Sequence, residues 1–179
     1  SAGDNSGRSV SGAGDVNGDG LDDLIVGAFR DDPNGSDSGA STVVFGKADG
    51  TAVELSDIES SSNSGGFVIN GVSTDDYSGY SVSGAGDVNG DGLADLIVGA
   101  PQDDPNGTDG DDDVPGSGAS TVVFGKADGT AVELSDIESS SNSGGFVING
   151  ALEGDNSGNS VSGAGDVNGD GLDDLIVGA

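Results

Sequence analysis

The sequence reads Asp-Val-Asn-Gly-Asp-Gly-Leu-Asp-Asp-Leu-Ile-Val-Gly-Ala over residues 15–28, and this stretch decides the fold. It recurs at residues 87–100 with one change, Ala94 in place of Asp22, and at residues 166–179 without change. Each copy joins a nine-residue loop rich in oxygen-bearing side chains to a short apolar run. Such repetition is typical of an array of small structural units, so one unit explains most of the chain.

The repeat extends beyond these stretches. Residues 39–71 are identical to residues 118–150, and the acidic loops begin 72 and 79 residues apart. The difference comes from an acidic insertion with Gly and Pro at residues 108–117, which we expect to lie on the surface. The chain therefore divides into a first unit at 1–71, a second at 72–150 and the first half of a third at 151–179.

Each unit is expected to form four short β-strands separated by turn residues. The spacing of Leu55 and Ile58 predicts a single helical turn that caps the sheet, and alternation places Phe67 and Ile69 on one face of the last strand. The strands predicted for the first unit are Arg8–Ala13, Asp23–Ala28, Ser41–Phe45 and Gly66–Asn70.

Tandem four-stranded units of this length are typical of β-propeller blades. We therefore predict an all-β fold with two complete blades of four antiparallel strands, half of a third blade, and an acidic loop between strands one and two of each. A β-helix would need a much shorter repeat. Because propellers close with about 4 to 8 blades, we expect the chain to belong to a larger array or to be completed by strand addition at the bare strand 175–179.

The composition restricts the function further. The formal net charge is −29, from 33 acidic against 4 basic residues, and this excludes binding to a phosphate backbone. Such a chain is either disordered or folded with its carboxylates neutralised by cations. The regularly placed apolar runs favour the folded alternative. No apolar stretch approaches the roughly 20 residues of a membrane span.

The acidic loops predict three Ca²⁺ sites. Positions 1, 3, 5 and 9 of each loop carry side-chain oxygens, and the residue at position 7 offers its backbone carbonyl. A set of hard oxygen ligands suits Ca²⁺ better than Mg²⁺, and the absence of His and Cys makes zinc and copper poor candidates. Position 8 is Ala in one copy, so we expect it to face solvent and not to bind metal. The predicted ligands are Asp15, Asn17, Asp19, Leu21 and Asp23; Asp87, Asn89, Asp91, Leu93 and Asp95; and Asp166, Asn168, Asp170, Leu172 and Asp174.

Other interpretations of the loop are a polar Asx turn without metal and other known calcium loops. An EF-hand needs an acidic residue at position 12 and flanking helices, but Val26, Val98 and Val177 stand there within the apolar runs. A dockerin-type loop fails for the same reason. Nonapeptide calcium repeats need tandem nine-residue turns, whereas the loops here are far apart.

The motifs at residues 7–10 and 15–28, with the later Val43-Val44-Phe45-Gly46 and Gly66–Gly71, resemble the FG-GAP repeat of integrin α-subunit β-propellers and related bacterial surface proteins. The resemblance implies a calcium ion between strands one and two of each blade, and a role in adhesion or extracellular recognition. Family propellers usually have seven blades. The first aromatic of the usual Phe-Gly opening is replaced, and Asn5-Ser6-Gly7, Tyr77-Ser78-Gly79 and Asn156-Ser157-Gly158 stand there, so packing at the start of each blade is expected to differ.

These observations predict a calcium-binding structural or adhesive module of an extracellular or cell-surface protein, without catalytic residues. The expected partners are other copies of the chain or adjoining repeats, and an extracellular protein or glycan ligand. The alternative is a subunit of a filament or ring, completed by strand addition between chains. An enzyme acting on polysaccharides is less favoured, because the chain has no His or Cys and its repeated acids are explained as calcium loops.

Overall fold

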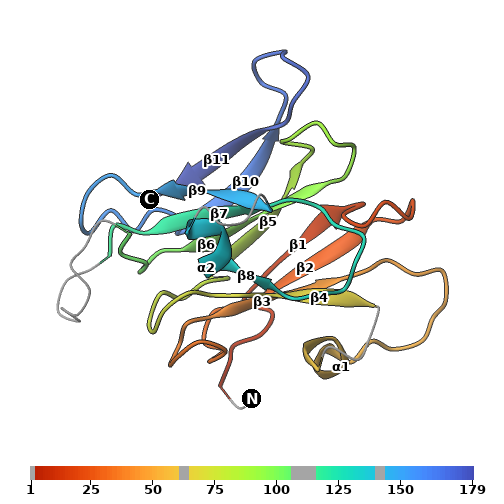
Figure 1. Cartoon of the computed structure of the whole chain (residues 1–179), viewed down its shortest axis with the longest axis horizontal. Helices are drawn as coiled ribbons and strands as arrows, with labels where there is room; N and C mark the ends of the chain where they lie inside the picture. The colour runs from red at the N-terminus through yellow and green to blue at the C-terminus, as the bar shows by residue number, and fades with distance from the viewer. Residues whose placement is uncertain (1–2, 61–64, 106–115, 140–143) are drawn as a thin grey trace.

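The computed structural model describes residues 3–60, 65–105, 116–139 and 144–179. Within these residues the chain forms three antiparallel sheets, which Figure 1 shows arranged as a fan from red through green to blue. The all-β prediction is confirmed. The predicted surface insertion falls largely on residues 106–115, which lie outside the described residues.

The first sheet has the order β1-β2-β3-β4-β8, in which only the β4–β8 pair is parallel; the second has the order β5-β6-β7-β9, and the third consists of β10-β11. Two short helices follow the third strands of the first two sheets, and each buries an isoleucine, Ile58 or Ile137. The strands are β1 (Ser9–Gly14), β2 (Asp23–Ala28), β3 (Ala40–Val44), β4 (Gly66–Asn70), β5 (Ser81–Gly86), β6 (Asp95–Ala100), β7 (Ala119–Val123), β8 (Val132–Glu133), β9 (Gly145–Asn149), β10 (Ser160–Gly165) and β11 (Asp174–Gly178); the helices are α1 (Leu55–Glu59) and α2 (Leu134–Glu138).

The first strands of the three sheets lie side by side, as both views show. Their small residues permit a close approach of backbones. A Cβ added at Gly84 would lie 2.7 Å from the Gly12 carbonyl oxygen, and one added at Gly163 would lie 2.9 Å from the Gly84 oxygen. The first strands of neighbouring sheets therefore pack backbone against backbone.

Two apolar cores lie between successive sheets, and both use the same positions of the repeat. The first core packs Ile25, Val43 and Phe67 of the first sheet against Val82 and Leu96 of the second; in the second core, Ile97 and Val122 pack beside Val161, Leu175 and Val177 of the third. Each sheet thus has one face for the preceding sheet and another for the following one. The outermost faces are open: Leu24 is 55% exposed where its equivalent Leu96 is 0% exposed, and Ile176 is 61% exposed where Ile97 is 0% exposed.

Parallel pairing between the two large units was not predicted from the sequence. β8 pairs in parallel with β4, joining Ile69 to Val132 and Asn70 to Glu133. The Asn70 amide donates to a Glu133 carboxylate oxygen over 2.7 Å, which strengthens the same junction. No helix in the described part of the chain is long and apolar enough to span a membrane.

Candidate metal centre

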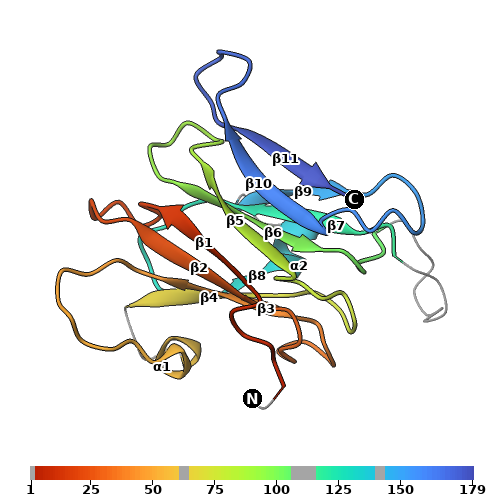
Figure 2. The ribbon, with the colours of Figure 1, turned by 180° about the vertical axis from the view of Figure 1, so that it is seen from behind.

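The three acidic loops project from the same end of the molecule, at the turns β1–β2, β5–β6 and β10–β11 (Figures 1 and 2). A β-bulge precedes each loop: in the first sheet the pairing passes from Gly12↔Leu24 to Gly14↔Asp23 and leaves Ala13 unpaired. Gly14 takes a φ of +71°, which a residue with a side chain rarely adopts. The bulge turns the strand end and begins the loop.

Within the first loop, the Asp15 carboxylate accepts hydrogen bonds from three backbone N–H groups. Its Oδ1 accepts from Gly18 at 2.8 Å and Asp19 at 3.0 Å, and its Oδ2 accepts from Gly20 at 2.9 Å. Asn17 Oδ1 accepts from the Asp19 N–H at 2.8 Å, and Asp19 Oδ1 accepts from the Leu21 N–H at 2.9 Å. The loop thus folds around its own side-chain oxygens.

The other two loops repeat this arrangement. Asp87 and Asp166 each accept from three N–H groups of their own loops, at 2.6–3.1 Å. Identical sequences thus give the same local hydrogen bonds in all three places, although the third loop is more exposed than the others.

The acid at position 9 lies at the base of each loop and is the most buried of the set. Asp23 is 1% exposed, and its two oxygens accept from the N–H groups of Val16 at 2.9 Å and Gly46 at 2.7 Å. Burial raises the pKa of Asp23; the two hydrogen bonds oppose this, and the charges of Asp19 and Asp15 add to the increase. The three carboxylates therefore lie close enough to repel one another.

Asp95 has the same surroundings in the second loop, with Val88 and Gly125 as donors at 2.9 Å each. Burial raises the pKa of Asp95, and the Asp91 and Asp87 charges add to this effect. The third equivalent, Asp174, accepts from the Val167 N–H at 2.8 Å and is less buried than Asp23 and Asp95.

The donor set fits a hard cation, although the carboxylates do not converge on one point. Among residues 3–60, 65–105, 116–139 and 144–179, no three acidic side chains form a group that could hold a metal ion as they stand. The loop carboxylates accept instead from backbone N–H groups, and each carboxylate keeps at least one further lone pair. In the same part of the chain, no lysine or arginine forms an ion pair with a loop carboxylate. Three close acids and one amide oxygen are thus without a cationic partner from the protein.

Position 8 contacts the neighbouring loop, which was not expected from the sequence. The N–H of Ala94 donates to the Asp15 carbonyl oxygen at 3.0 Å, and the N–H of Asp173 donates to that of Asp87 at 3.1 Å. Asp173 Oδ2 also accepts from the Asp87 N–H at 2.8 Å. Asp22 is exposed as predicted, but the prediction of a solvent-facing side chain is wrong for Asp173, because a preceding loop packs beside it.

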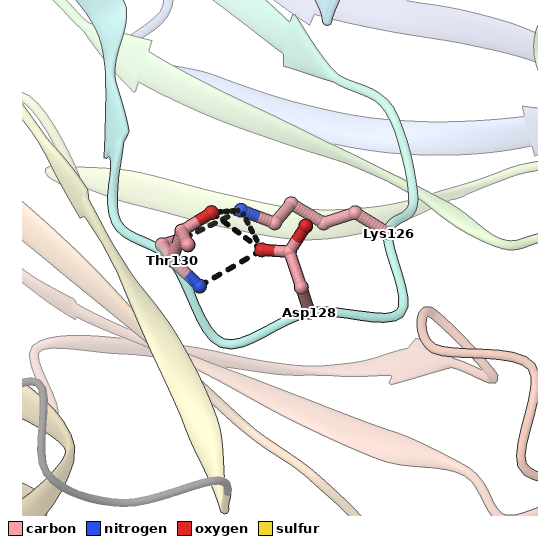
Figure 3. A network of polar contacts seen from close by, with 3 residues as sticks. All are labelled: Lys126, Asp128 and Thr130. Carbon is pink, nitrogen blue, oxygen red and sulfur yellow. Dashed lines mark hydrogen bonds and ion pairs between the residues drawn. The ribbon is translucent and has the colours of Figure 1, made fainter.

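A lysine network supports the segment that supplies Gly125. Figure 3 shows Lys126 paired with Asp128 at 2.9 Å and donating to the Thr130 hydroxyl at 2.7 Å. Hydrogen bonds from Thr130 and then Lys126 lower the pKa of Asp128 to about 2. The Lys126 ammonium also lies 5.0 Å from the centre of the Phe67 ring, in the first sheet. Sequence analysis did not assign this bridging role to the lysine.

The comparison with protein families agrees with the repeat boundaries seen in the structure. The model of the FG-GAP repeat matches residues 6–44, 78–123 and 157–179. The chain belongs to the FG-GAP repeat family. Each FG-GAP match begins just before the first strand of a sheet and includes one acidic loop. No curated protein sequence matches the chain.

Proposed function

We propose that the three FG-GAP loops bind Ca²⁺ and that the chain is a calcium-stabilised structural and adhesive module of a β-propeller. The observation that carries this proposal is the repeated group of close carboxylates without a cationic partner, at one end of successive sheets. The proposed ligands are the side chains at loop positions 1, 3, 5 and 9 and the carbonyl at position 7. A bound Ca²⁺ would supply the positive charge that these oxygens lack.

The structural role follows from repulsion within each loop. Three aspartates per loop carry like charges, and one of them is buried, so an uncompensated loop opposes its own folding. Three Ca²⁺ would add six positive charges and change the formal charge of the chain from −29 to −23. The loops also contact one another through Ala94 and Asp173, so neutralising one loop supports the next.

Calorimetric titration of the chain with Ca²⁺ tests this proposal. We expect binding to three sites and a melting temperature that rises with free Ca²⁺, because a ligand that binds only the folded state stabilises it. Asp19→Ala should remove one site, whereas Asp22→Ala, which gives the first loop the residue of the second, should leave three. An unchanged melting temperature in excess chelator would contradict a structural role for calcium.

We further propose that the open faces of the outer sheets are completed by other blades of the same type, from adjoining repeats or other copies of the chain. The face that bears Val10 and Leu24 is equivalent to the face of the second sheet that packs against the first. The face that bears Ile176 is equivalent to the face of the first sheet, with Ile25, that packs against the second sheet. The two ends are therefore complementary, as head-to-tail contacts require.

Light scattering distinguishes this second function from an isolated module. Filaments or rings of the chain should give masses above 17.1 kDa that increase with concentration. Leu24→Asp should reduce the association, because it places a charge on the contact face, while Ser56→Asp, on the exposed side of α1, serves as the control. A monodisperse monomer at high concentration would exclude self-assembly.

The proposed role is binding and not catalysis, and the proposed location is outside the cell. Extracellular calcium is more abundant than cytosolic calcium and suits loops of this kind. The whole chain contains no His or Cys, which removes the usual base and the strongest nucleophile. Turnover of a polysaccharide by the purified chain would contradict this assignment.

A further inference from the structure

A cluster of aromatic and arginine side chains lies at the end of the first two sheets opposite the acidic loops. The rings of Tyr77 and Tyr80 stand edge-on to Phe29, with centroid distances of 5.7 and 5.3 Å. Phe29 is 7% exposed. The Arg8 guanidinium lies 4.8 Å from the centre of the Tyr80 ring and donates to its hydroxyl at 3.0 Å. The two tyrosines are thus supported from behind by a packed cluster.

The same two tyrosines line a groove of about 310 Å³ beside the third sheet. Both are half-buried, and the groove is also lined by Pro101, Gln102, Asp155, Asn156, Asn159 and Ala179. Gln102 Nε2 donates to Asn156 Oδ1 at 2.6 Å. The side-chain oxygen of Gln102 and the side-chain amide of Asn159 have no hydrogen-bond partner among the described residues. The groove therefore combines an aromatic wall with amides that can still donate and accept.

Differences between the units gather at this end of the molecule. Residues 4–31 and 76–103 differ at five pairs of positions, and four of the pairs lie here: 5/77, 8/80, 29/101 and 30/102. The third unit has Asn156 and Asn159 where the second has Tyr77 and Tyr80. These residues meet across the junctions: Phe29 packs on Tyr77 and Tyr80 at the first junction, and Gln102 bonds to Asn156 at the second. The second junction thus has polar amides where the first has packed rings, and these amides face the groove.

Tyr77 also occupies a backbone conformation that does not suit a tyrosine. Its φ is +58°, and its equivalents Asn5 and Asn156 have φ values of +53° and +54°. Asparagine tolerates this left-handed region, whereas a bulky residue is strained there. A strained residue that the structure retains points to a functional site. Here the strain places a ring at the wall of the groove.

We propose that this groove binds a neutral saccharide. The apolar C–H face of a sugar ring would pack on Tyr77 or Tyr80, and its hydroxyls would pair with the amides of Gln102, Asn156 and Asn159. Amides match hydroxyl groups because each both donates and accepts hydrogen bonds. An uncharged ligand is not repelled by a chain of net charge −29, whereas an acidic glycan is. The size of the groove is at the lower end for ligand sites and suits a short glycan segment.

This inference deepens the recognition role proposed above and rests on it for the class of ligand, but it is independent of the calcium loops. Tyrosine fluorescence provides a direct test, because the chain has two Tyr and no Trp, and both tyrosines line the groove. The chain is titrated in calcium-containing buffer with cellotriose, mannotriose, galactose and tri-N-acetylchitotriose. We expect a saturable change with at least one of them, together with magnetisation transfer to its C–H protons in NMR. No saturable change with any of the four overturns the proposal.

Two variants separate binding from a structural role. Tyr77→Asn and Tyr80→Asn restore the residues of the third unit, so both should fold. Each should weaken binding about tenfold by calorimetry, which corresponds to the loss of one aromatic contact. Tyr77→Asn should also melt at the same or a higher temperature, because it relieves the strained φ. A lower melting temperature with unchanged affinity would show that the tyrosines only pack the junction.

Asp22→Ala, in the acidic loop at the opposite end, is the control and should leave sugar affinity unchanged. Calcium stoichiometry is measured on the same samples. If no sugar binds while three calcium sites are present, only the proposal of saccharide binding is contradicted. If calcium does not bind, the proposed calcium-dependent function is contradicted instead.

Discussion

The backbone N–H of Ala94 donates to the carbonyl oxygen of Asp15 across 3.0 Å, joining the acidic loop of the first sheet to that of the second. The N–H of Asp173 makes the same contact with Asp87, so the first and second loops each accept a hydrogen bond from the following loop. A loop that loses its order should therefore affect its neighbour along the chain.

Asp19→Ala should expose the Ala94 amide to solvent exchange. Without a complete ligand set the first loop is expected to loosen, and the loss of one hydrogen bond, worth about 1 kcal/mol, should speed exchange at Ala94 about fivefold. Amide exchange measured by NMR in calcium buffer checks this. The Asp173 amide, whose acceptor belongs to the second loop, is the internal control. Equal acceleration at both amides would indicate general unfolding and contradict a local coupling.

The buried aspartate of the second loop should matter more than its equivalent in the third. Asp95→Ala leaves the half-buried N–H groups of Val88 and Gly125 without acceptors, which should cost about 2–4 kcal/mol. Asp174→Ala should cost less than about 1 kcal/mol, because its site is more open to water. Urea unfolding in excess chelator removes the contribution of calcium from both values. Equal losses would show that burial at this position is unimportant.

The free energy of unfolding should decrease as the pH rises, because of the buried carboxyl of Asp76, which lies near Asp103 and away from the acidic loops. Burial and then the charge of Asp103 raise the pKa of Asp76 to about 7. Since the folded protein retains this proton when the unfolded chain has lost it, the free energy of unfolding should fall between pH about 4 and about 7. Asp76→Asn should remove this part of the pH dependence and stabilise the protein by about 1–3 kcal/mol at pH 8. Thermal melts of both proteins across this range measure the effect, and parallel curves would contradict it.

A methyl group added to the first strand of a sheet should lower stability at Gly84 but not at the equivalent Gly12. Gly84→Ala places a Cβ 2.7 Å from the Gly12 carbonyl oxygen, whereas a Cβ at Gly12 meets no atom within 4 Å. Because the obstacle is backbone, the two sheets must separate, and we expect a loss of more than about 2 kcal/mol. Gly12→Ala should change stability by less than about 0.5 kcal/mol. Urea denaturation of the pair provides the comparison. If the chain associates head to tail, the Gly12 variant should lose this tolerance at high concentration.

Leu96 and Leu24 offer a second matched pair. Leu96 is 0% exposed between two sheets, so Leu96→Ala should cost about 2–5 kcal/mol. Leu24 holds the same position on an open face, and Leu24→Ala should cost less than about 1 kcal/mol in the dilute chain. Dilute samples unfolded in urea test the difference. Similar losses would mean that the open face is covered in solution.

Much of this architecture could be predicted from the sequence, because it depends on local patterns repeated three times. The predicted strands Asp23–Ala28 and Gly66–Asn70 are confirmed at both ends. The first strand begins and ends one residue later than predicted, because the bulge at Ala13 lets Gly14 pair with Asp23. The third strand lies one residue earlier, since Ala40 pairs with Asn70 and the chain leaves the sheet after Val44.

Contacts between units could not be predicted, because no local pattern encodes them. The parallel pairing of β4 with β8 joins residues far apart in sequence and involves only two residue pairs. Gly46, which donates to Asp23 at the base of the first loop, follows β3 in the chain. Lys126, which lies over the Phe67 ring, follows β7 in the same way. The ligand assignments at loop positions 1, 3, 5, 7 and 9 stay predictions, and calcium titration will decide them.

The close approach of Gly12 to Gly84, and of Gly84 to Gly163, has a consequence for how this chain changes over generations. Each junction is built from the same two surfaces, and the inner strands have the same spacing at both. A unit copied or deleted in one recombination event thus meets a neighbour that already fits it, without compensating substitutions. Length can change in whole units, while the residues that differ between units are concentrated at the end far from the acidic loops.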